Sequence, residues 1–376
     1  MAKTILGIDI GYESLKLALV HAGQVEKLIR VPMPEKMLKE GRVVSVEALG
    51  ELLRSTIKEN HLRASGVALV LNQEIVYTRT VNLPWMTEEQ LRVNLPYEFR
   101  DYLDEDLKQY TFDYAMHSDP ADYEDPADRK KGTRKEKDRK KSGKADPQDA
   151  NRAAAYGQQQ MAEAMAASDE ETEEGMEVLG AVIRTEVLEE YQMLIRKMGM
   201  KLLVAAPSLS AYSNLIRTFA PDQTEKETCI LDLGHGAVRI HMFKGSRHIT
   251  SRILESGLSL LDETAADLYD VDTHLGHVYL LSDHEGCQSH ERLLEAYRDI
   301  AGELVRVINF YRFSNPDSSL DELWICGGGA CIPALTEEIR SNVELDVHTA
   351  EELTTRHPEV GDAEAAVFAE AIGIAL

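Results

Sequence analysis

An Asp-x-Gly motif occurs twice in this chain, each time between a hydrophobic run and an alternating one. The first copy contains Asp9 and Gly11, and the second contains Asp232 and Gly234. Each copy predicts a β-hairpin, because glycine permits a tight turn between two apolar strands. Glycine also lets backbone amides approach an anion, and an aspartate can orient hydrated Mg²⁺ on a polyphosphate. Two such hairpins predict two half-domains that hold a nucleotide between them.

The two copies also agree beyond the glycine, where Lys16 takes the place of Arg239. Lys16 would stand beside the turn as a point charge for a β- or γ-phosphate. An exposed strand lysine would give the same sequence, so both interpretations stay open. Further along, a strand at 323–326 enters the run Gly327, Gly328, Gly329, and a helix opens near 332–335. Such glycines let a nucleotide base and ribose lie against the backbone.

The composition bounds the class of protein. A length of 376 residues suggests two to four domains or subdomains, and 41 basic against 65 acidic residues leave a net charge of −24. That charge argues against a general nucleic-acid binder, since phosphates would be repelled. The sequence contains neither an apolar run of about 18 residues nor a signal peptide, and its four cysteines form no disulfide framework. We therefore expect a soluble cytosolic protein.

Apolar spacing predicts alternating strands and helices around these motifs. The expected strands are 66–71, 77–81, 177–183, 201–206 and 323–326, and the expected helices are 47–60, 88–103, 185–198, 208–219, 259–269, 291–313 and 363–376. Thr87 is expected to cap the helix from 88, and Pro96 to kink or split it. Between about 117 and 175 the chain is charged or low in apolar residues, which predicts disorder. Its basic run, 129–144, is interpreted as a solvated loop rather than a patch for nucleic acid or anionic lipid.

A histidine-rich segment has spacing that a metal site could use. It contains His274, His277, His284, Cys287 and His290. The apolar run 279–281 inside it favours a structural role over a metal site. The sequence shows no Ser-His-Asp order, nucleophile elbow or P-loop, so hydrolase and Walker-type functions receive no support.

The three glycine motifs resemble the phosphate-1, phosphate-2 and adenosine motifs of the actin-like ATPase superfamily, at 7–16, 231–239 and 327–335. The segment 81–99, with Pro84, Met86 and a Glu-Glu-x-Leu run, resembles the start of subdomain 1C in the PilM family of type IV pilus assembly proteins, which is related to FtsA. The resemblance covers nearly the whole chain except the charged insertion.

The resemblance implies an α/β, actin-like (ribonuclease H-like) duplicated fold with two lobes and subdomains 1A, 1C, 2A and 2B. The expected boundaries are 1–80 and 184–221 for 1A, 81–183 for 1C with its insertion, 222–270 and 321–360 for 2A, 271–320 for 2B, and 361–376 for a helix that returns to 1A.

The resemblance also implies ATP with Mg²⁺ in the cleft between the lobes. The residues expected to bind the nucleotide are Asp9, Gly11, Tyr12, Glu13, Lys16, Asp232, Gly234, Gly236, Gly257, Gly327, Gly328 and Gly329. Asp9 and Asp232 would hold Mg²⁺ through water, and no catalytic residue is assigned. The implied partner is the cytoplasmic N-terminus of a PilN-like bitopic inner-membrane protein, together with other pilus platform proteins. The partner-binding residues would be Leu83, Trp85, Met86, Leu95 and Phe99.

Several positions depart from the family pattern. Small Ser or Thr residues normally follow the two hairpin glycines, but this chain has Tyr12 and Glu13 in one turn and His235 in the other. A carboxylate beside a polyphosphate opposes binding unless a cation offsets it. We therefore expect weak ATP binding and at most a weak ATPase.

Two other functions share the superfamily. A small-molecule kinase of the sugar type would need a carboxylate acting on a substrate hydroxyl, and no sugar-reading motif lies between the hairpins. An FtsA-like filament protein would need a basic amphipathic C-terminal helix, whereas 364–376 has no basic residue. We therefore expect recruitment to the membrane through a protein partner.

Overall fold

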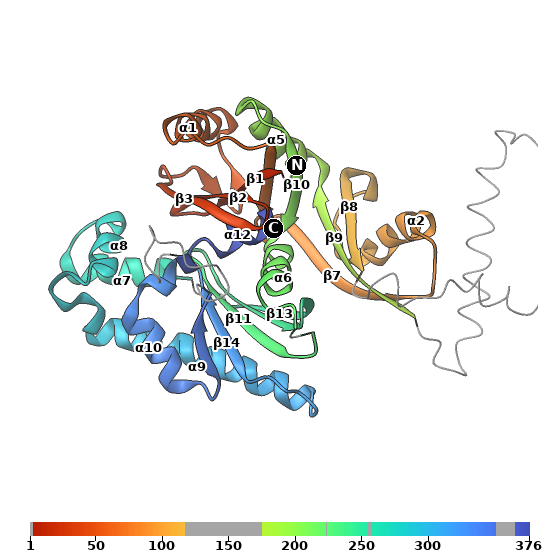
Figure 1. Cartoon of the computed structure of the whole chain (residues 1–376). Coiled ribbons are helices and arrows are strands. Elements are labelled where there is room, and N and C mark those ends of the chain that lie inside the picture. The colour runs from red at the N-terminus through yellow and green to blue at the C-terminus, as the bar shows by residue number, and fades with distance from the viewer. Residues whose placement is uncertain (1–2, 117–174, 223, 255–256, 351–364) are drawn as a thin grey trace, which may run out of the picture. The chain divides into compact units, whose positions relative to one another are not determined.

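The computed structural model describes residues 3–116, 175–222, 224–254, 257–350 and 365–376. The chain divides into two compact units (Figure 1). The larger consists of 1–77, 108–111 and 182–376, and the smaller of 78–107 and 112–181. The predicted charged insertion falls outside the described residues, apart from Gly175.

The strands and helices alternate much as the apolar spacing predicts. The strands are β1 (Thr4–Ile10), β2 (Ser14–His21), β3 (Gln24–Pro32), β4 (Leu38–Lys39), β5 (Arg42–Val43), β6 (Gly66–Leu71), β7 (Val76–Leu83), β8 (Tyr110–Met116), β9 (Met176–Arg184), β10 (Leu202–Pro207), β11 (Glu227–Leu233), β12 (Val238–Lys244), β13 (Arg247–Leu254), β14 (Glu322–Cys326) and β15 (Asp346–Thr349). The α-helices are α1 (Val46–Glu59), α2 (Glu88–Glu98), α5 (Thr185–Lys197), α6 (Ser208–Phe219), α7 (Ser259–Tyr269), α8 (Thr273–Leu281), α9 (Glu291–Ser314), α10 (Pro333–Asn342) and α12 (Ala369–Ala375). The 3₁₀ turns are η1 (Arg100–Tyr102), η2 (Leu107–Gln109), η5 (His284–Ser289) and η6 (Gly328–Cys331).

The larger unit contains two sheets with the same design. One has the order β3-β2-β1-β6-β10 and the other β13-β12-β11-β14-β15. In each, the first three strands are antiparallel and the remaining pairs are parallel. The central strands β1, β6 and β11 are almost wholly buried, as their continuous apolar runs require. The duplicated α/β architecture predicted from the repeated hairpins is therefore confirmed.

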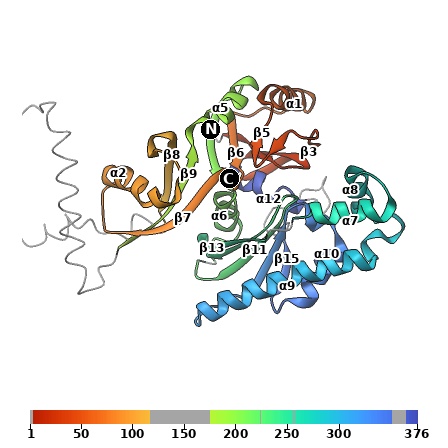
Figure 2. The same cartoon turned by 180° about the vertical axis from the view of Figure 1, so that it is seen from behind.

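Helices cover the two sheets of this unit (Figure 2). The short helix α12 packs against α6 and against β1, β2 and β6, while α1 packs on α5 and α9 on α10. Close approach of α12 depends on glycine, because a Cβ on Gly7 would lie 1.8 Å from the carbonyl oxygen of Ala371, and one on Gly373 would lie 2.2 Å from that of Ala211. The C-terminal helix is thus fixed against the strand that carries the first motif.

The smaller unit contains a three-stranded sheet, β7-β9-β8, with helix α2. Thr87 caps α2 in a reciprocal capping box with Gln90, as the sequence predicts. The helix ends at Glu98, however, so the predicted extent to residue 103 is wrong. Pro96 has no N–H to donate and its ring crowds the preceding turn, and the chain continues as the 3₁₀ turn η1.

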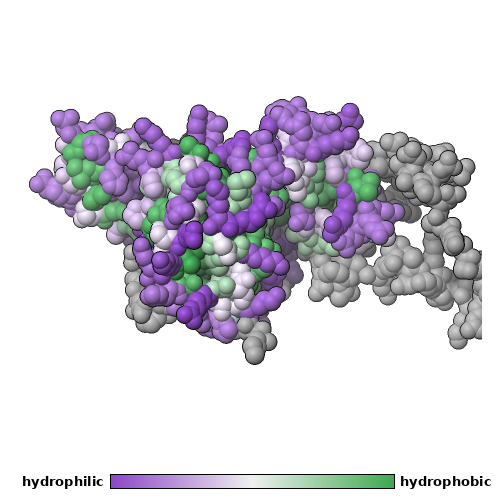
Figure 3. Space-filling view, turned by 90° about the horizontal axis from the view of Figure 1, so that it is seen from above, coloured by the Kyte–Doolittle hydropathy of each residue, from purple (hydrophilic) through white to green (hydrophobic). Residues whose placement is uncertain are grey.

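The molecular surface is mainly polar on the face viewed from above, where hydrophobic residues form only small groups (Figure 3). None of the helices in the described residues is long and apolar enough to cross a membrane.

Candidate functional site

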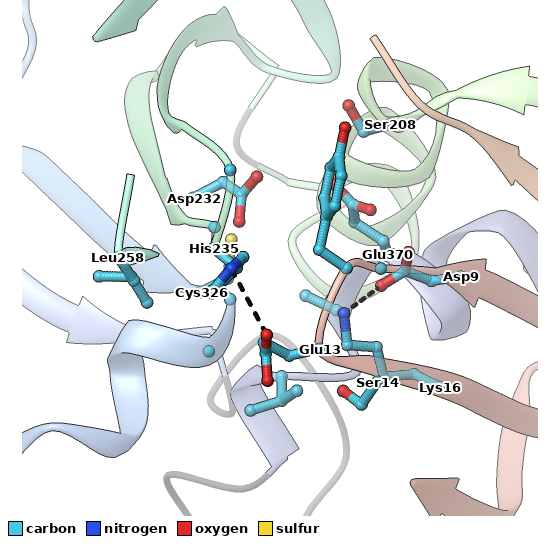
Figure 4. Close-up of a pocket in the computed structure, with 18 of the residues that line it drawn as sticks. Asp9, Glu13, Ser14, Lys16, Ser208, Asp232, His235, Leu258, Cys326 and Glu370 are labelled. Carbon is cyan, nitrogen blue, oxygen red and sulfur yellow. Dashed lines mark hydrogen bonds and ion pairs between the residues drawn. The ribbon is translucent and has the colours of Figure 1, made fainter. Parts of the chain in front are cut away.

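A cleft in the larger unit brings the two Asp-x-Gly hairpins face to face. The β1–β2 hairpin supplies Asp9, Glu13 and Lys16, and the side chains of Asp232, His235 and Cys326 face them across the pocket (Figure 4). The cleft contains about 1030 Å³ of empty space, including the solvent at its mouth.

Each motif aspartate pairs with the cation opposite it in its own hairpin. Asp9 faces Lys16 across β1 and β2, and Asp232 faces Arg239 across β11 and β12. Lys16 Nζ lies 2.8 Å from Asp9 Oδ2, while Arg239 Nη1 lies 3.5 Å from Asp232 Oδ2. Lys16 is a partly buried, ion-paired residue of the cleft, and not an exposed strand lysine.

The motif glycines leave space for the side chains of Lys16 and Arg239. A Cβ on Gly11 would lie 2.6 Å from Lys16 Nζ and 3.0 Å from the carbonyl oxygen of Ser14. One on Gly234 would lie 2.7 Å from the carbonyl oxygen of Ala237 and 3.2 Å from Arg239 Nη1. Neither glycine has a positive φ, so close approach rather than backbone conformation explains both. The two halves of the cleft use the same residue type for the same steric reason.

Burial shifts the proton affinities of these groups. It raises the pKa of Asp232, although Arg239 and Lys16 oppose that shift. Burial alone would lower the pKa of Lys16, but its interactions with Asp9, Glu370 and Asp232 together outweigh burial and raise the pKa. The pairs therefore hold Lys16 charged.

A third carboxyl group, Glu370 of α12, lies in the same cleft and was not predicted from the sequence. Its Oε1 accepts a hydrogen bond of 3.0 Å from the hydroxyl of Tyr212 on α6. Burial and the negative charges of Asp9 and Asp232 raise the pKa of Glu370 to about 8. Its protonated form is therefore the main form at neutral pH, and it adds little negative charge to the cleft.

The two hairpin turns contact each other at the mouth of the cleft. Glu13 Oε1 lies 3.4 Å from His235 Nε2, and a Cβ on Gly236 would lie 3.2 Å from the ring of Tyr12. The Tyr12 hydroxyl donates a hydrogen bond to Glu74, which also lies 3.7 Å from Arg239. Burial and the hydrogen bond to Glu74 raise the pKa of Tyr12 to about 12. The turns are thus joined by polar contacts.

Behind this contact, Asp262 of α7 interacts with two imidazoles. Its Oδ2 lies 3.2 Å from His235 Nδ1, and its Oδ1 lies 3.0 Å from His277 Nδ1. Burial would raise the pKa of Asp262, but its interactions with His235 and His277 outweigh burial and lower it. The pKa of His277 is raised because its interactions with Asp262 exceed the effect of burial.

The remaining residues of the histidine-rich segment have structural partners or lie at the surface. His284 stacks on the ring of Tyr279 at 4.1 Å between centroids, His290 caps α9, and Cys287 is buried. His274 is exposed on α8. Among these residues, only His277 lines the cleft.

The predicted adenosine-side glycines mostly serve close packing. A Cβ on Gly327 or Gly329 would lie 2.5 Å from an atom of β11, and one on Gly257 would lie 2.2 Å from the carbonyl oxygen of His235. Gly327 also has a φ of +83°. Gly328 lines the cleft, and a Cβ added to it would have its nearest neighbour, Leu258, at 3.8 Å. A ligand can therefore approach the backbone of Gly328.

These observations bear on how well the cleft suits a nucleotide. Asp9 and Asp232 both line the cleft, but each is already paired with a cation, Lys16 or Arg239. A triphosphate between the hairpins would also have to separate Glu13 from His235 and pass the Glu13 carboxylate. The phosphate side therefore fits the group poorly, and the nucleotide-binding assignment stays a prediction.

The predicted partner-binding residues divide into two groups in the smaller unit. Leu83, Leu95 and Phe99 are buried in its core, whereas Trp85 and Met86 are partly exposed. Gly180 allows the Phe99 ring to lie on β9, because a Cβ there would lie 2.7 Å from that ring. Of these five residues, Trp85 and Met86 are the two that offer side-chain surface to a partner.

Sequence reasoning missed Glu74, Asp262 and Glu370, which interact with the charged groups of the hairpins. Each comes from an element far along the chain from a hairpin residue that it faces, and Glu74 and Asp262 lie in no recognisable motif. For Glu370 a signal existed, since it is the single charged residue in the apolar run 365–376. An isolated acid in a buried helix often marks a polar site.

Comparison with known proteins agrees with this fold. The family model "Type IV pilus assembly protein PilM" matches residues 7–147 and 160–376. A solved "PilM-PilN type IV pilus biogenesis complex" has a TM-score of 0.74 and 17% identity, over 99% of this chain and 97% of that one. The ethanolamine utilization protein EutJ from Carboxydothermus hydrogenoformans has a TM-score of 0.54 and 12% identity, over 100% of this chain and 89% of that one.

No curated protein sequence matches the chain. The family model nevertheless spans both hairpins, the glycine turn and most of the described smaller unit. On that match, together with the duplicated actin-like fold, the chain belongs to the PilM family of type IV pilus assembly proteins.

Proposed function

We propose that this chain is an actin-like scaffold of type IV pilus assembly, or of a related competence or type II secretion machine. It works at the cytoplasmic face of the inner membrane, where it binds the N-terminal segment of a PilN-like bitopic protein. The observation that carries the proposal is the family match over almost the whole chain. The similar solved structure is a PilM-PilN complex, which supports PilN as the kind of partner.

The smaller unit offers apolar surface for such a peptide. On α2, Val93 is 64% exposed and Tyr97 is 57% exposed, one helical turn apart. Trp85 and Met86 lie just before the same helix and are partly exposed. Exposed apolar residues at this spacing are typical of surfaces that bind short peptide segments.

ATP binding in the cleft is weak in this proposal, and hydrolysis is inefficient. The basic groups at the hairpins, Lys16 and Arg239, are already paired with Asp9 and Asp232. Glu13 adds a negative charge where the phosphates would enter. The cleft therefore stabilises the two-lobed fold more than it promotes phosphoryl chemistry.

Isothermal titration calorimetry with a synthetic peptide tests the partner assignment. The peptide would carry the first dozen or so residues of the PilN-like protein from the same genome. We expect saturable binding that Trp85→Ala or Tyr97→Ala weakens about tenfold. Phe313→Ala is the matched control, since this ring on α9 is 85% exposed in the other unit. Absence of binding by the wild-type chain, or an equal loss in the Phe313 variant, would overturn the proposal.

A further inference from the structure

Four side chains from four separate segments form a closed ring at the mouth of the cleft. Glu13 comes from the β1–β2 turn, His235 from the β11–β12 turn, Asp262 from α7 and His277 from α8. Figure 4 shows Glu13 and His235 pointing toward each other. We propose that this ring is a binding site for one divalent transition-metal ion of the Zn²⁺ class, a site that rests on neither peptide nor nucleotide binding.

The imidazole rings of His235 and His277 have the same orientation relative to Asp262 and Glu13. Each Nδ1 faces the buried carboxylate of Asp262, at 3.2 Å for His235 and 3.0 Å for His277. Each Nε2 faces Glu13, at 3.4 Å for His235 and 4.0 Å for His277. In metal sites, a carboxylate that accepts the Nδ1 proton fixes the tautomer and leaves the Nε2 lone pair for the ion. Asp262 is placed for that role toward both histidines.

The ring is not internally satisfied as it stands. His235 Nδ1 and Asp262 Oδ2 are buried without a hydrogen-bond partner, although they lie close together, because their geometry is poor for a hydrogen bond. Asp262 is only 1% exposed, so solvent does not compensate its carboxylate. A cation bound by the two Nε2 atoms and Glu13 would pull both rings into line with Asp262. Ligand atoms of Glu13, His235 and Asp262 already lie within 4.8 Å of one another, and His277 has to move toward this group to join it.

The donor set selects the class of metal. Two imidazoles and one carboxylate are a set that zinc uses in open sites, whereas Mg²⁺ and Ca²⁺ prefer oxygen alone. At zinc bond lengths, neighbouring ligands in a tetrahedron lie about 3.3 Å apart. The observed distance from His235 Nε2 to Glu13 Oε1 is 3.4 Å, whereas His277 Nε2, which lies 4.0 Å from Glu13 Oε2, must move closer to share one ion with them.

A glycine in α8 allows the fourth group to reach the ring. A Cβ on Gly276 would lie 2.6 Å from the carbonyl oxygen of Asp262 and 2.7 Å from the amide nitrogen of Ala266. Its absence lets α8 lie directly on α7 and places His277 beside Asp262. A bound ion would therefore join both hairpin turns to α8 and hold the cleft closed.

The test uses the full chain without a histidine tag, freed of metals with a chelator and then exchanged into chelator-free buffer. Isothermal titration calorimetry with ZnCl₂ alone should show one ion bound per chain, with a dissociation constant in the micromolar range or lower. Bound Zn²⁺ should also raise the melting temperature of the chain. Glu13→Gln and His277→Gln should each weaken binding about tenfold or more, and Asp262→Asn about tenfold to a hundredfold. His274→Gln, an exposed histidine of the same helix, is the matched control.

A second readout separates the site from surface chelation. Co²⁺ bound by the wild-type chain should give visible d–d absorption that Glu13→Gln alters and His274→Gln leaves unchanged. The melting temperature of each metal-free variant shows whether that variant has folded. If only one of the Glu13 and His277 variants folds, that variant alone is sufficient for the test. The proposal is overturned if the wild-type chain binds no stoichiometric Zn²⁺, or if the Glu13 and His277 variants bind as tightly as wild type.

Discussion

The carboxyl group of Glu370 lies 3.0 Å from the hydroxyl of Tyr212, among the two ion pairs of the cleft. Its pKa is raised from 4.5 to about 8 by burial and by Asp9 and Asp232. When folding raises the pKa of an acid, the acid makes its full contribution to stability at pH values below its pKa in the unfolded chain. That contribution is lost as the pH rises through the folded value. The wild-type chain should therefore lose stability between about pH 4.5 and pH 8.

Glu370→Gln removes this titration while keeping the size of the side chain. We expect the unfolding free energy of wild type to fall relative to that of the variant across this range, by a few kcal/mol, with about 5 as the upper limit. Thermal denaturation at several pH values measures the trend. Glu59→Gln, at an exposed position of α1, should run parallel to wild type. If stability depends on pH in the same way in wild type and in Glu370→Gln, Glu370 is ionised in the folded chain across this range.

Gly327 is constrained both by its backbone and by its neighbours. Its φ is +83°, and a Cβ there would lie 2.5 Å from Asp232 Oδ1. Gly23 has a similar φ of +78°, but a Cβ on it would have no neighbouring atom within 4 Å. Gly23→Ala should therefore cost only the conformational strain, about 1–2 kcal/mol. Gly327→Ala should cost several kcal/mol more, because the clash with β11 is added.

Melting temperatures of these two variants compare two glycines of similar φ, of which Gly327 also has a ψ of −179°, a combination that almost only glycine adopts. Because the chain has two units, the comparison of melting temperatures is safer than a single unfolding free energy. Equal losses would mean that the glycine turn needs only its backbone conformation. A larger loss for Gly327→Ala is expected from the clash with Asp232 and Leu233 together with the backbone conformation of Gly327.

Sequence reasoning found the elements that local pattern determines. The two hairpins follow from the alternating residues on either side of each motif glycine, and the N-cap at Thr87 follows from its place behind a proline turn. Contacts between distant segments were not accessible in this way. The sequence did not show whether Phe99 is buried or exposed, because apolar residues lie on more than one face of the preceding helix α2.

Phe99 tests the distinction between a core residue and a partner-binding residue. It is 0% exposed, with its ring 5.9 Å from that of Phe112. Phe99→Ala should destabilise the smaller unit by about 3–5 kcal/mol and should make it sensitive to limited proteolysis. Phe313→Ala, at an exposed ring, should change stability by less than about 0.5 kcal/mol. If the Phe99 variant resists protease as well as the Phe313 variant does, its side chain contributes to a surface instead.

Glu13 is the residue whose replacement should improve nucleotide binding. Its carboxylate lines the cleft, 3.4 Å from His235, where we expect the phosphates of a bound nucleotide to enter. A unit charge about 6 Å from a phosphate is worth roughly 3 kcal/mol at an effective dielectric constant near 20. Glu13→Ser should therefore raise the affinity for Mg-ATP about tenfold or more, and Glu13→Gln should recover the part that is due to charge alone.

Calorimetry with Mg-ATP in buffer free of transition metals gives the affinities, with Glu295→Ser at an exposed position of α9 as control. Phosphate release should stay slow in every variant, because Glu13 is not assigned any role in hydrolysis. An unchanged or lower affinity in Glu13→Ser would mean that repulsion at the hairpins is not what limits binding. The burial of Glu370 and the pairing of Lys16 and Arg239 would then be the remaining causes.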